Sequence, residues 1–297
     1  MFFIIGIVLI LGVVMGGFAL SGGNISILIQ PIEVGMVFGI ALGASLIANP
    51  PKVVFGSFKA LIAAVKSKGY TKKDYAEVLI LLYQLVSKIK RNGPLSVEAD
   101  VNSPTNSEIF KKYGSNFLKN HHFVTFLCDN LKVIVSGSIT ANDLETLMDN
   151  EIEAFHEESM LISHSVARTS DAMPGLGLVA AVLGVVLTMG KIDQPAEVIG
   201  ESIAAALLGT FVGILMCYGF IGPFATNLEY KANDDIVYLK IIKTALLALI
   251  NGASSMMVME HARRVIPSDN KPTFEELDRM RNPIDKGSST SAPPPKK

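Results

Sequence analysis

The chain has 297 residues, of which 49% are hydrophobic and only 18% are charged, and its net charge is −1. Soluble domains carry about 25% charged residues, so this deficit and the mean hydropathy of +0.41 indicate a membrane protein. A net charge near zero argues against nucleic acid as a partner, because nucleic-acid binding needs a basic surface.

Two apolar segments open the chain. No charged side chain precedes Glu33, and the polar turn at residues 21–24 divides this stretch. We predict one membrane span over about residues 2–20 and a second over about residues 34–49, which ends before Pro50. The second is short against the roughly 20 residues that a crossing helix needs, and an earlier start would place Glu33 at the interface. A secretory signal peptide, the alternative for the first segment, would begin with basic residues that MFFIIG lacks.

The following 120 residues read as a helical domain. Apolar residues recur at helical spacing on two segments, and Thr140 and Asp143 have the spacing of a capping box. The two apolar faces comprise Tyr75, Val78, Leu79, Leu82, Leu85, Val86 and Ile89, and then Leu144, Met148, Ile152 and Phe155. We predict breaks at Gly93-Pro94 and at residues 102–105, and a surface turn between helices at His121-His122.

Charge within this domain is segregated. Residues 52–91 carry nine Lys or Arg against Asp74 and Glu77, whereas residues 143–158 carry seven acids and no base. Solvated helix faces and partner-binding surfaces both produce such blocks, so the pattern leaves the two interpretations open.

Two further predicted spans carry small residues at regular spacing. The third span, residues 174–190, opens with a proline, and the fourth covers about residues 202–224. Small residues let membrane helices approach closely. They are Pro174, Gly177, Ala181, Gly184 and Thr188 in the third span, and Ser202, Ala206, Gly209 and Gly213 in the fourth.

The stripe of the third span is expected to face a partner's helix, because its seven-residue repeat suits a long, nearly parallel contact. Ordinary packing within the chain explains the glycines of spans one and two, which are Gly12, Gly16, Gly35, Gly39 and Gly43. No span interior contains an acid or base, so any titrating group on an ion path belongs to another protein.

Lys and Arg set the orientation. Six lysines follow the second span before the first acid, whereas the loop between spans three and four has one Lys against three acids. The positive-inside rule therefore places both termini in the cytoplasm. Residues 236–250 could be taken for a fifth span, but Lys240 and Lys243 favour a long amphipathic cytoplasmic helix.

The predicted fold class is an all-α integral membrane protein with four transmembrane helices and a large helical cytoplasmic domain. The predicted divisions are transmembrane helices 1 and 2 in residues 1–50, a cytoplasmic helical domain in 51–170, transmembrane helices 3 and 4 in 171–226, cytoplasmic C-terminal helices in 227–280 and a disordered tail in 281–297.

Motifs for enzymatic chemistry are missing from the sequence. The five histidines show no HExxH or Cys-His spacing, and Cys128 and Cys217 are too few for a disulfide framework. There is no P-loop, dinucleotide fingerprint or G-x-S-x-G. We therefore expect no metal, no cofactor, no catalytic residue and no enzymatic activity.

Several segments together resemble a known family. DAMPGLGLVAAVLGVVLTMG and ALLGTFVGILMCYGFIGPFA, with GFALSGGNISILIQPIE and LLYQLVSKIKRNGPLSVEADV, are similar to the motility protein A (MotA/PomA) subunits of flagellar stators. The wider MotA/TolQ/ExbB proton-channel superfamily, which includes energisers of outer-membrane transport, shares spans three and four. Four spans, an inside N-terminus and the LSVEAD segment favour the flagellar branch.

The resemblance implies an assembly in the bacterial inner membrane. It implies a ring, five copies in the family picture, around a dimer of a one-span B subunit that carries an essential aspartate and is anchored to peptidoglycan. Protonation of that aspartate lets the ring step, and its cytoplasmic domains drive the rotor switch protein FliG.

The resemblance also carries roles to residues of this chain. Pro174 and Pro223 match the two prolines near the ion path, and Ala181, Thr210 and Tyr218 match positions that line it. Glu98 matches the acidic rotor contact. The basic rotor contact falls on Lys90, where many relatives have arginine, so Arg91 beside it is included. Asn150 stands where relatives have a second acid, and no role is carried to it.

The coupling ion is expected to be a proton. Sodium-driven relatives tend to have a hydroxyl at the position of Ala181, and Thr188 and Thr210 alone supply few of the oxygen ligands that a sodium ion needs. The alternatives to a proton-driven stator subunit are an ExbB/TolQ-like energiser of outer-membrane transport and a passive membrane scaffold.

Overall fold

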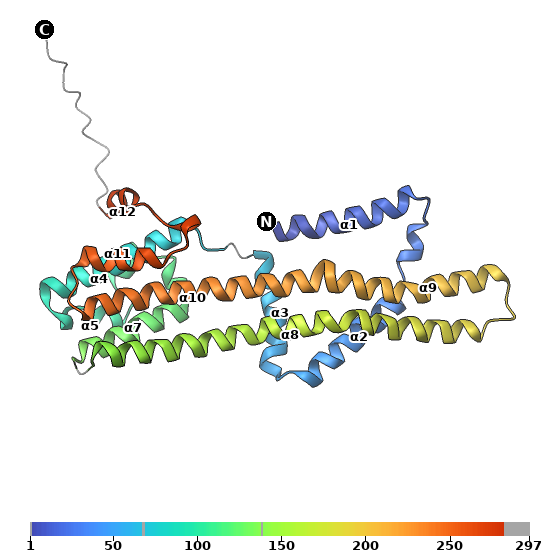
Figure 1. Ribbon diagram of the computed structural model, residues 1–297, viewed down its shortest axis with the longest axis horizontal. Helices are drawn as coiled ribbons and strands as arrows, with labels where there is room; N and C mark the ends of the chain where they lie inside the picture. Colours follow the sequence, from blue (N-terminus) through green and yellow to red (C-terminus); the bar gives the residue numbers. More distant parts are fainter. Residues whose placement is uncertain (1, 67–68, 138, 282–297) are drawn as a thin grey trace, which may run out of the picture. The chain divides into compact units, whose positions relative to one another are not determined.

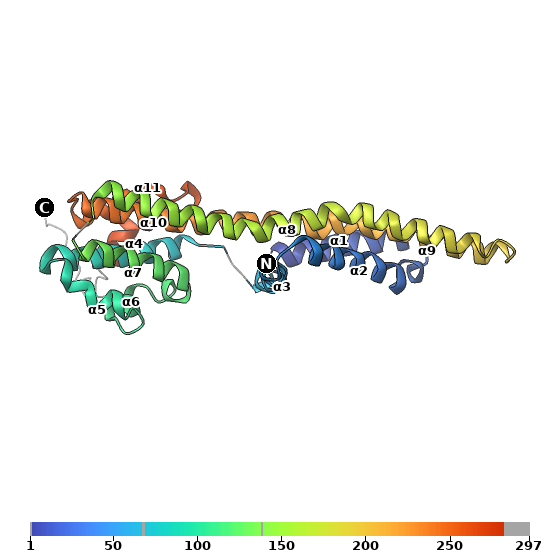
Figure 2. The same ribbon diagram turned by 90° about the horizontal axis from the view of Figure 1, so that it is seen from below.

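The computed structural model describes residues 2–66, 69–137 and 139–281, and every regular element in these ranges is helical (Figures 1 and 2). The all-α prediction is therefore confirmed. The chain divides into two compact units, which we call the first unit (Met1–Gly69 and Phe155–Asn233) and the second unit (Tyr70–Ala154 and Asp234–Lys297). The predicted disordered tail lies outside the described residues from position 282 onward.

Four helical segments are long and apolar enough to cross a membrane. The first is α1 (Phe2–Leu20), and the second is α2 (Pro31–Ala48), which follows the short 3₁₀ turn η1 (Ile25–Leu28). Helix α2 starts three residues before the predicted bound, with Pro31 at its first position, where a missing N–H costs nothing. It ends before Pro50-Pro51, because a residue that precedes proline disfavours the helical conformation. Helix α3 (Pro51–Lys66) follows directly.

The third apolar segment belongs to α8 (Ala141–Met189), a single helix of 49 residues. Pro174 lies inside this helix, so the helix itself begins well before the predicted start of the third span. Proline removes one backbone hydrogen bond, but the helix continues through it because the flanking turns pack closely on a neighbouring helix, as described below. Thr140 and Asp143 interact at its start and cap the helix: Asp143 N donates to Thr140 Oγ1 at 3.2 Å, and that hydroxyl donates to the Asp143 carboxylate at 2.7 Å.

The fourth apolar segment is a helical run from Ala196 to Ile250. It comprises α9 (Ala196–Leu215), a π-helical turn η4 (Met216–Ile221) and α10 (Gly222–Ile250). The predicted fourth span and the predicted amphipathic helix over 236–250 are therefore two parts of one continuous helix. Lys240 is exposed and Leu239, Ile241 and Ile242 are buried, which confirms the amphipathic character of the second part.

The second unit is built on α4 (Lys72–Asn92), α7 (His121–Val135), α11 (Ser255–Val265) and α12 (Phe274–Arg281), with parts of α8 and α10. All seven residues of the predicted α4 face are buried. Shorter elements are η2 (Pro94–Val97), α5 (Glu98–Asn102), α6 (Glu108–Tyr113), η3 (Phe117–Lys119) and η5 (Ser268–Asn270). Both predicted breaks are confirmed. His121 and His122 begin α7, where Asn120 supplies the cap, so the predicted surface turn is wrong.

Aromatic residues form the centre of the second unit. The rings of Phe123 and Tyr238 stack with centroids 4.6 Å apart, and Tyr70 lies 4.9 Å from Tyr238. The Tyr70 hydroxyl donates to Asp235 at 2.5 Å. Burial and this carboxylate raise the pKa of Tyr70 above its ordinary value, because both disfavour the charged phenolate.

Candidate functional site

Helices α8 and α9 approach so closely that backbone meets backbone. A Cβ atom on Gly177 would lie 2.6 Å from the Gly209 carbonyl oxygen, and one on Gly213 would lie 2.5 Å from the Met173 carbonyl oxygen. Real Cβ atoms do not approach so closely, so only glycine fits at these two positions. Contacts of this kind bring Cα–H groups against carbonyls of the facing helix, which is how small residues stabilise helix pairs in membranes.

The rest of the small-residue stripe continues the same contact. A Cβ on Gly184 would lie 2.6 Å from the Ala206 Cβ, and Ala181, which is 6% exposed, borders Gly209. Thr188 is 1% exposed, and its hydroxyl donates to the Gly184 carbonyl of its own helix at 2.8 Å. The prediction that this face contacts a partner's helix is therefore wrong: it packs on α9 of the same chain.

The glycines of the first two spans behave in the opposite way. Apart from the backbone of its own helix, no atom lies within 4 Å of a Cβ built on Gly12, Gly16, Gly35, Gly39 or Gly43. We predicted that packing within the chain explains these five glycines. The structure does not support this, because the described part of the chain does not pack against them. On α8 the side left uncovered is the bulky one, with Leu178, Val179, Val182, Leu183, Val186 and Leu187 exposed.

The π turn η4 lies where two polar side chains of α8 contact the α9–α10 backbone. The Ser170 hydroxyl donates to the Cys217 carbonyl at 3.0 Å, and the Ser163 hydroxyl donates to the Ala225 carbonyl at 2.9 Å. Pro223 lies just after the turn and lacks an N–H, so the helix ladder is interrupted there. π turns occur frequently at functional sites. This turn was not among the elements predicted from the sequence, although Gly219, Gly222 and Pro223 signal an irregular helix.

Tyr218 and Pro223 share a polar cavity of about 310 Å³ in the first unit. Tyr218 is 74% exposed, and the ionisable residues that line the cavity with it are His164, Asp171 and Glu229. Ala181 and Thr210 lie elsewhere, at the close contact, since a Cβ on Gly177 would lie 3.2 Å from the Thr210 Cα. The structure thus separates the five predicted ion-path residues into two groups, with Pro174 next to the Met173–Gly213 contact.

The three predicted rotor contacts lie on one exposed turn of the second unit. Lys90 and Arg91 end α4, and Glu98 begins α5 after the turn at Gly93, whose φ of +84° favours glycine. All three charged residues are exposed.

A buried carboxylate that the sequence analysis missed fixes this turn. Asp100 is 8% exposed, and it accepts hydrogen bonds from Lys88 Nζ and Ser107 Oγ, both at 2.6 Å. Ser107 in turn caps α6 through the Phe110 N–H at 3.4 Å. The Asp100 carboxylate therefore links the end of α4 to the starts of α5 and α6 by hydrogen bonds. A charge-assisted bond to a buried group is strong, and removing one partner leaves the other unsatisfied.

The segregated charges pair partly within the chain. Lys243 contacts Glu145 at 3.1 Å and Asp149 at 2.7 Å in the second unit, and Lys52 pairs with Glu158 in the first. Part of the acidic block is thus occupied by lysines of the same chain. Among the described residues, no group of three or more His, Cys, Asp or Glu side chains could hold a metal ion.

Two protein-family models match this chain. The family model described as MotA/TolQ/ExbB proton channel family matches residues 119–240, which include α8, α9 and the π turn. The family model described as Motility protein A N-terminal matches residues 4–93. The first match defines the class as membrane proton-channel proteins, and the second covers spans α1 and α2 together with α4.

Individual relatives are more specific. Motility protein A of Escherichia coli is 37% identical over 94% of this chain and 94% of its own length, and that of Salmonella typhimurium is 36% identical over 95% and 97%. The solved structure of MotAB from C. jejuni has a TM-score of 0.75 at 21% identity and covers 91% of this chain and 98% of that chain. For the flagellar MotAB stator complex from Bacillus subtilis the TM-score is 0.73 at 21% identity, with 92% and 99% covered. The chain belongs to the motility protein A family.

Proposed function

We propose that this chain is a stator subunit of the bacterial flagellar motor, which converts proton flow across the inner membrane into torque on the rotor. The observation that carries the proposal is the 37% identity to a motility protein A over nearly the full length of both chains. The match of the N-terminal family model to residues 4–93 favours the flagellar branch over energisers of outer-membrane transport.

The proposed working unit contains more than this chain. It comprises a ring of copies, five in the family picture, around a dimer of a one-span B subunit, with four spans per copy and both termini in the cytoplasm. MotAB complexes among the similar structures support a B subunit as partner. The essential acid is assigned to the B subunit, because the apolar stretch of α8 after Asp171 contains no ionisable side chain.

The contacts in the first unit indicate a different role for each of its two groups of predicted ion-path residues. Ala181 and Thr210 lie at the rigid α8–α9 contact, which holds the pair together while the uncovered side of α8 meets a partner. Tyr218 and Pro223 lie at the π turn, where the interrupted ladder lets the helix bend. Pro174 removes one backbone hydrogen bond from α8 as well. We propose that these two interruptions let the helix pair respond when the partner's acid gains or loses a proton.

The second unit is proposed to deliver the movement to FliG. Lys90, Arg91 and Glu98 are exposed on a turn that the buried Asp100 holds in place. Functional contacts often lie on loops that a rigid scaffold positions, which is the arrangement found here.

Deletion of the gene in its own organism tests the proposal. We expect cells that assemble filaments but do not rotate them, and complementation by the intact gene should restore swimming. Normal swimming with loss of siderophore uptake would instead identify an energiser of outer-membrane transport. A passive scaffold would give no proton flux in vesicles, even together with the proposed one-span B subunit.

A further inference from the structure

Helix α3 presents three different sides. Val53 and Val54 are buried against the first unit, whereas Phe55, Phe58 and Ile62 are 74%, 52% and 64% exposed. The lysines at positions 52 and 59 are seven residues apart and therefore lie on one side, next to the exposed apolar side. A helix with an exposed apolar side and flanking lysines is typical of one that lies in a membrane surface.

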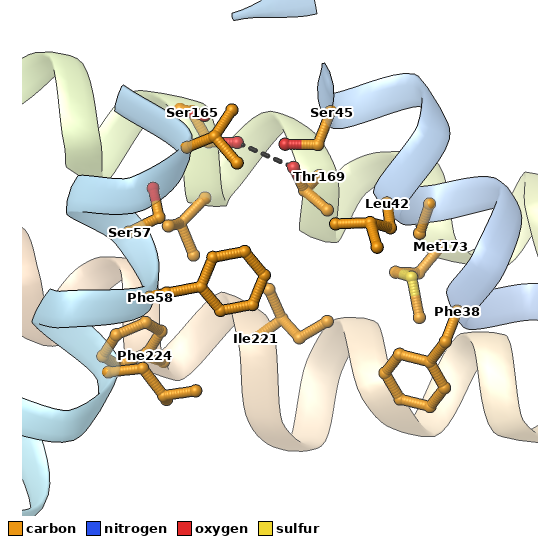
Figure 3. Close-up of a pocket in the computed structure, with 14 residues that line it drawn as sticks. Phe38, Leu42, Ser45, Ser57, Phe58, Ser165, Thr169, Met173, Ile221 and Phe224 are labelled. Carbon is orange, nitrogen blue, oxygen red and sulfur yellow. Dashed lines mark hydrogen bonds between the residues drawn. The ribbon is translucent and has the colours of Figure 1, made fainter. Parts of the chain in front are cut away.

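A cavity of about 360 Å³ opens beside α3 in the first unit (Figure 3). Residues from α2, α3, α8, the π turn and α10 line it, and Phe38, Phe58, Met173 and Ile221 form much of its wall. Its volume lies within the range of small-molecule sites, which are predominantly apolar. Phe58 lines the cavity and also belongs to the exposed side of α3, so the cavity adjoins that exposed apolar side.

Two of the four hydroxyl groups in the cavity wall are hydrogen-bonded within their own helices. Four serines and threonines from α2, α3 and α8 line it (Figure 3). The Ser57 hydroxyl donates to the Val53 carbonyl at 2.9 Å, and the Thr169 hydroxyl donates to the Ser165 carbonyl at 3.0 Å. These donors are used within their own helices, so they need no polar ligand. An apolar occupant suits such a wall, whereas water needs several polar partners.

We infer that this cavity binds one acyl chain of an anionic phospholipid, whose headgroup contacts the lysines of α3. Lys59 is exposed and has no ion pair among the described residues, and the Lys52 side chain stays 82% exposed although it pairs with Glu158. Anionic headgroups are attracted to clustered lysines at a membrane surface. The inference requires only that the first unit lies in a membrane, and it does not depend on torque generation.

The chain contains no tryptophan, which permits a direct test. The full-length Phe58→Trp chain is reconstituted in phosphatidylcholine vesicles that contain a minor fraction of phosphatidylglycerol, with bromine on the acyl chains of one lipid or the other. Brominated phosphatidylglycerol should quench the fluorescence of the introduced tryptophan roughly fivefold more per lipid molecule than brominated phosphatidylcholine, since one lysine near an anionic surface contributes about this factor. Lys59→Gln should reduce that preference.

Two matched variants define the site. In Leu187→Trp the indole lies on the exposed side of α8, 14 residues beyond the cavity residue Met173, and its quenching should follow the mole fraction of either brominated lipid. Ser57→Leu, added to Phe58→Trp, fills the cavity and should abolish the preference. If Phe58→Trp does not fold, Phe38→Trp on the α2 wall replaces it.

Two results would overturn the inference. Equal quenching of the Phe58→Trp chain by both lipids would mean that only bulk lipid reaches this surface. Absence of quenching by either lipid would mean that protein, from a second copy or another chain, closes the cavity. Swimming by a strain that carries the Lys59→Gln gene reports separately on the proposed function, so the two failures can be distinguished.

Discussion

Single glycines decide how α8 and α9 pair. At Gly177 and Gly213 the facing atoms are backbone, which cannot move aside as a flexible side chain can. The spacing of small residues correctly predicts a close helix contact, but it cannot say which helix occupies it. That depends on the partner surface, and here the complementary stripe of α9 fills the position where we expected another protein.

Gly177→Ala should destabilise the first unit. The added methyl would lie 2.6 Å from the Gly209 carbonyl, and overpacking of this kind costs about 1–3 kcal/mol. Thermal unfolding of the purified protein in detergent measures the effect. The control is Gly175→Ala two residues away, where no atom lies within 4 Å, and where alanine should be neutral or stabilise the helix by about 0.5–1 kcal/mol. Equal melting temperatures for the two variants would contradict the close contact.

Glu260 makes the stability of the second unit depend on pH in the acidic range. Hydrogen bonds from Arg263 at 2.7 Å and from Arg264 at 3.1 Å lower the pKa of its carboxyl to about 2. Because the folded pKa lies below the ordinary 4.5, this carboxylate stabilises the fold above pH 4.5, and its contribution is lost as the pH falls from 4.5 towards 2.

Glu260→Gln should therefore be less stable than the original chain at pH 7, and the difference should shrink as the pH falls through that window. Urea unfolding, followed by the near-ultraviolet circular dichroism of the tyrosine cluster, reports on this unit. A difference between the two proteins that stays constant from pH 7 to pH 2 would show that the three side chains do not interact as described.

At the scale of elements, apolar periodicity predicts that a helix forms more accurately than it predicts the residues at which the helix begins and ends. The seven-residue face of α4, the breaks around α5 and the cap of α8 follow from local patterns, and all are observed. Helix α8 continues through Pro174, and only the π turn η4 separates α9 from α10. In both places a proline or glycine indicates that the helix could break there. Whether it does break depends on the packing of neighbouring helices, which the local sequence does not show.

The turn between α4 and α5 carries the most specific expectation at this scale. Surface ion pairs contribute only about 0–1 kcal/mol each, so Lys90→Glu or Glu98→Lys alone should reduce swimming partly and more visibly under load. The double reversal should nearly abolish it, because each exposed charge would then face a like charge on the rotor. Complementary reversals on FliG should restore part of the swimming speed.

Asp100→Asn serves as the contrasting variant for that experiment. It weakens the bonds from Lys88 and Ser107 that hold the turn, while Lys90 and Glu98 keep their charges. Complementary changes on FliG should therefore not rescue it. Rescue of Asp100→Asn, or a double reversal that no longer reaches the membrane, would mean that these charges serve folding and not rotor contact.

For the molecule as a whole, the sequence already predicts an all-helical membrane protein and its family, because both depend on features spread over most of the chain. Hydropathy predicts the four apolar segments, and the quoted motifs extend from α1 to the π turn. The apolar cavity beside α3 and the turn held by Asp100 could not be predicted in this way. They require side chains from α2, α3 and α8, or from α4, α5 and α6, to meet in space.

Rotation of single motors tests the central claim most directly. In the deletion strain, a bead on a filament stub is followed while expression of the chain is induced together with its B subunit. A torque-generating subunit should raise the rotation speed in equal steps as units join, and collapse of the proton gradient should stop the rotation. Full-speed rotation before induction, or no rotation after both proteins have reached the membrane, would contradict the account.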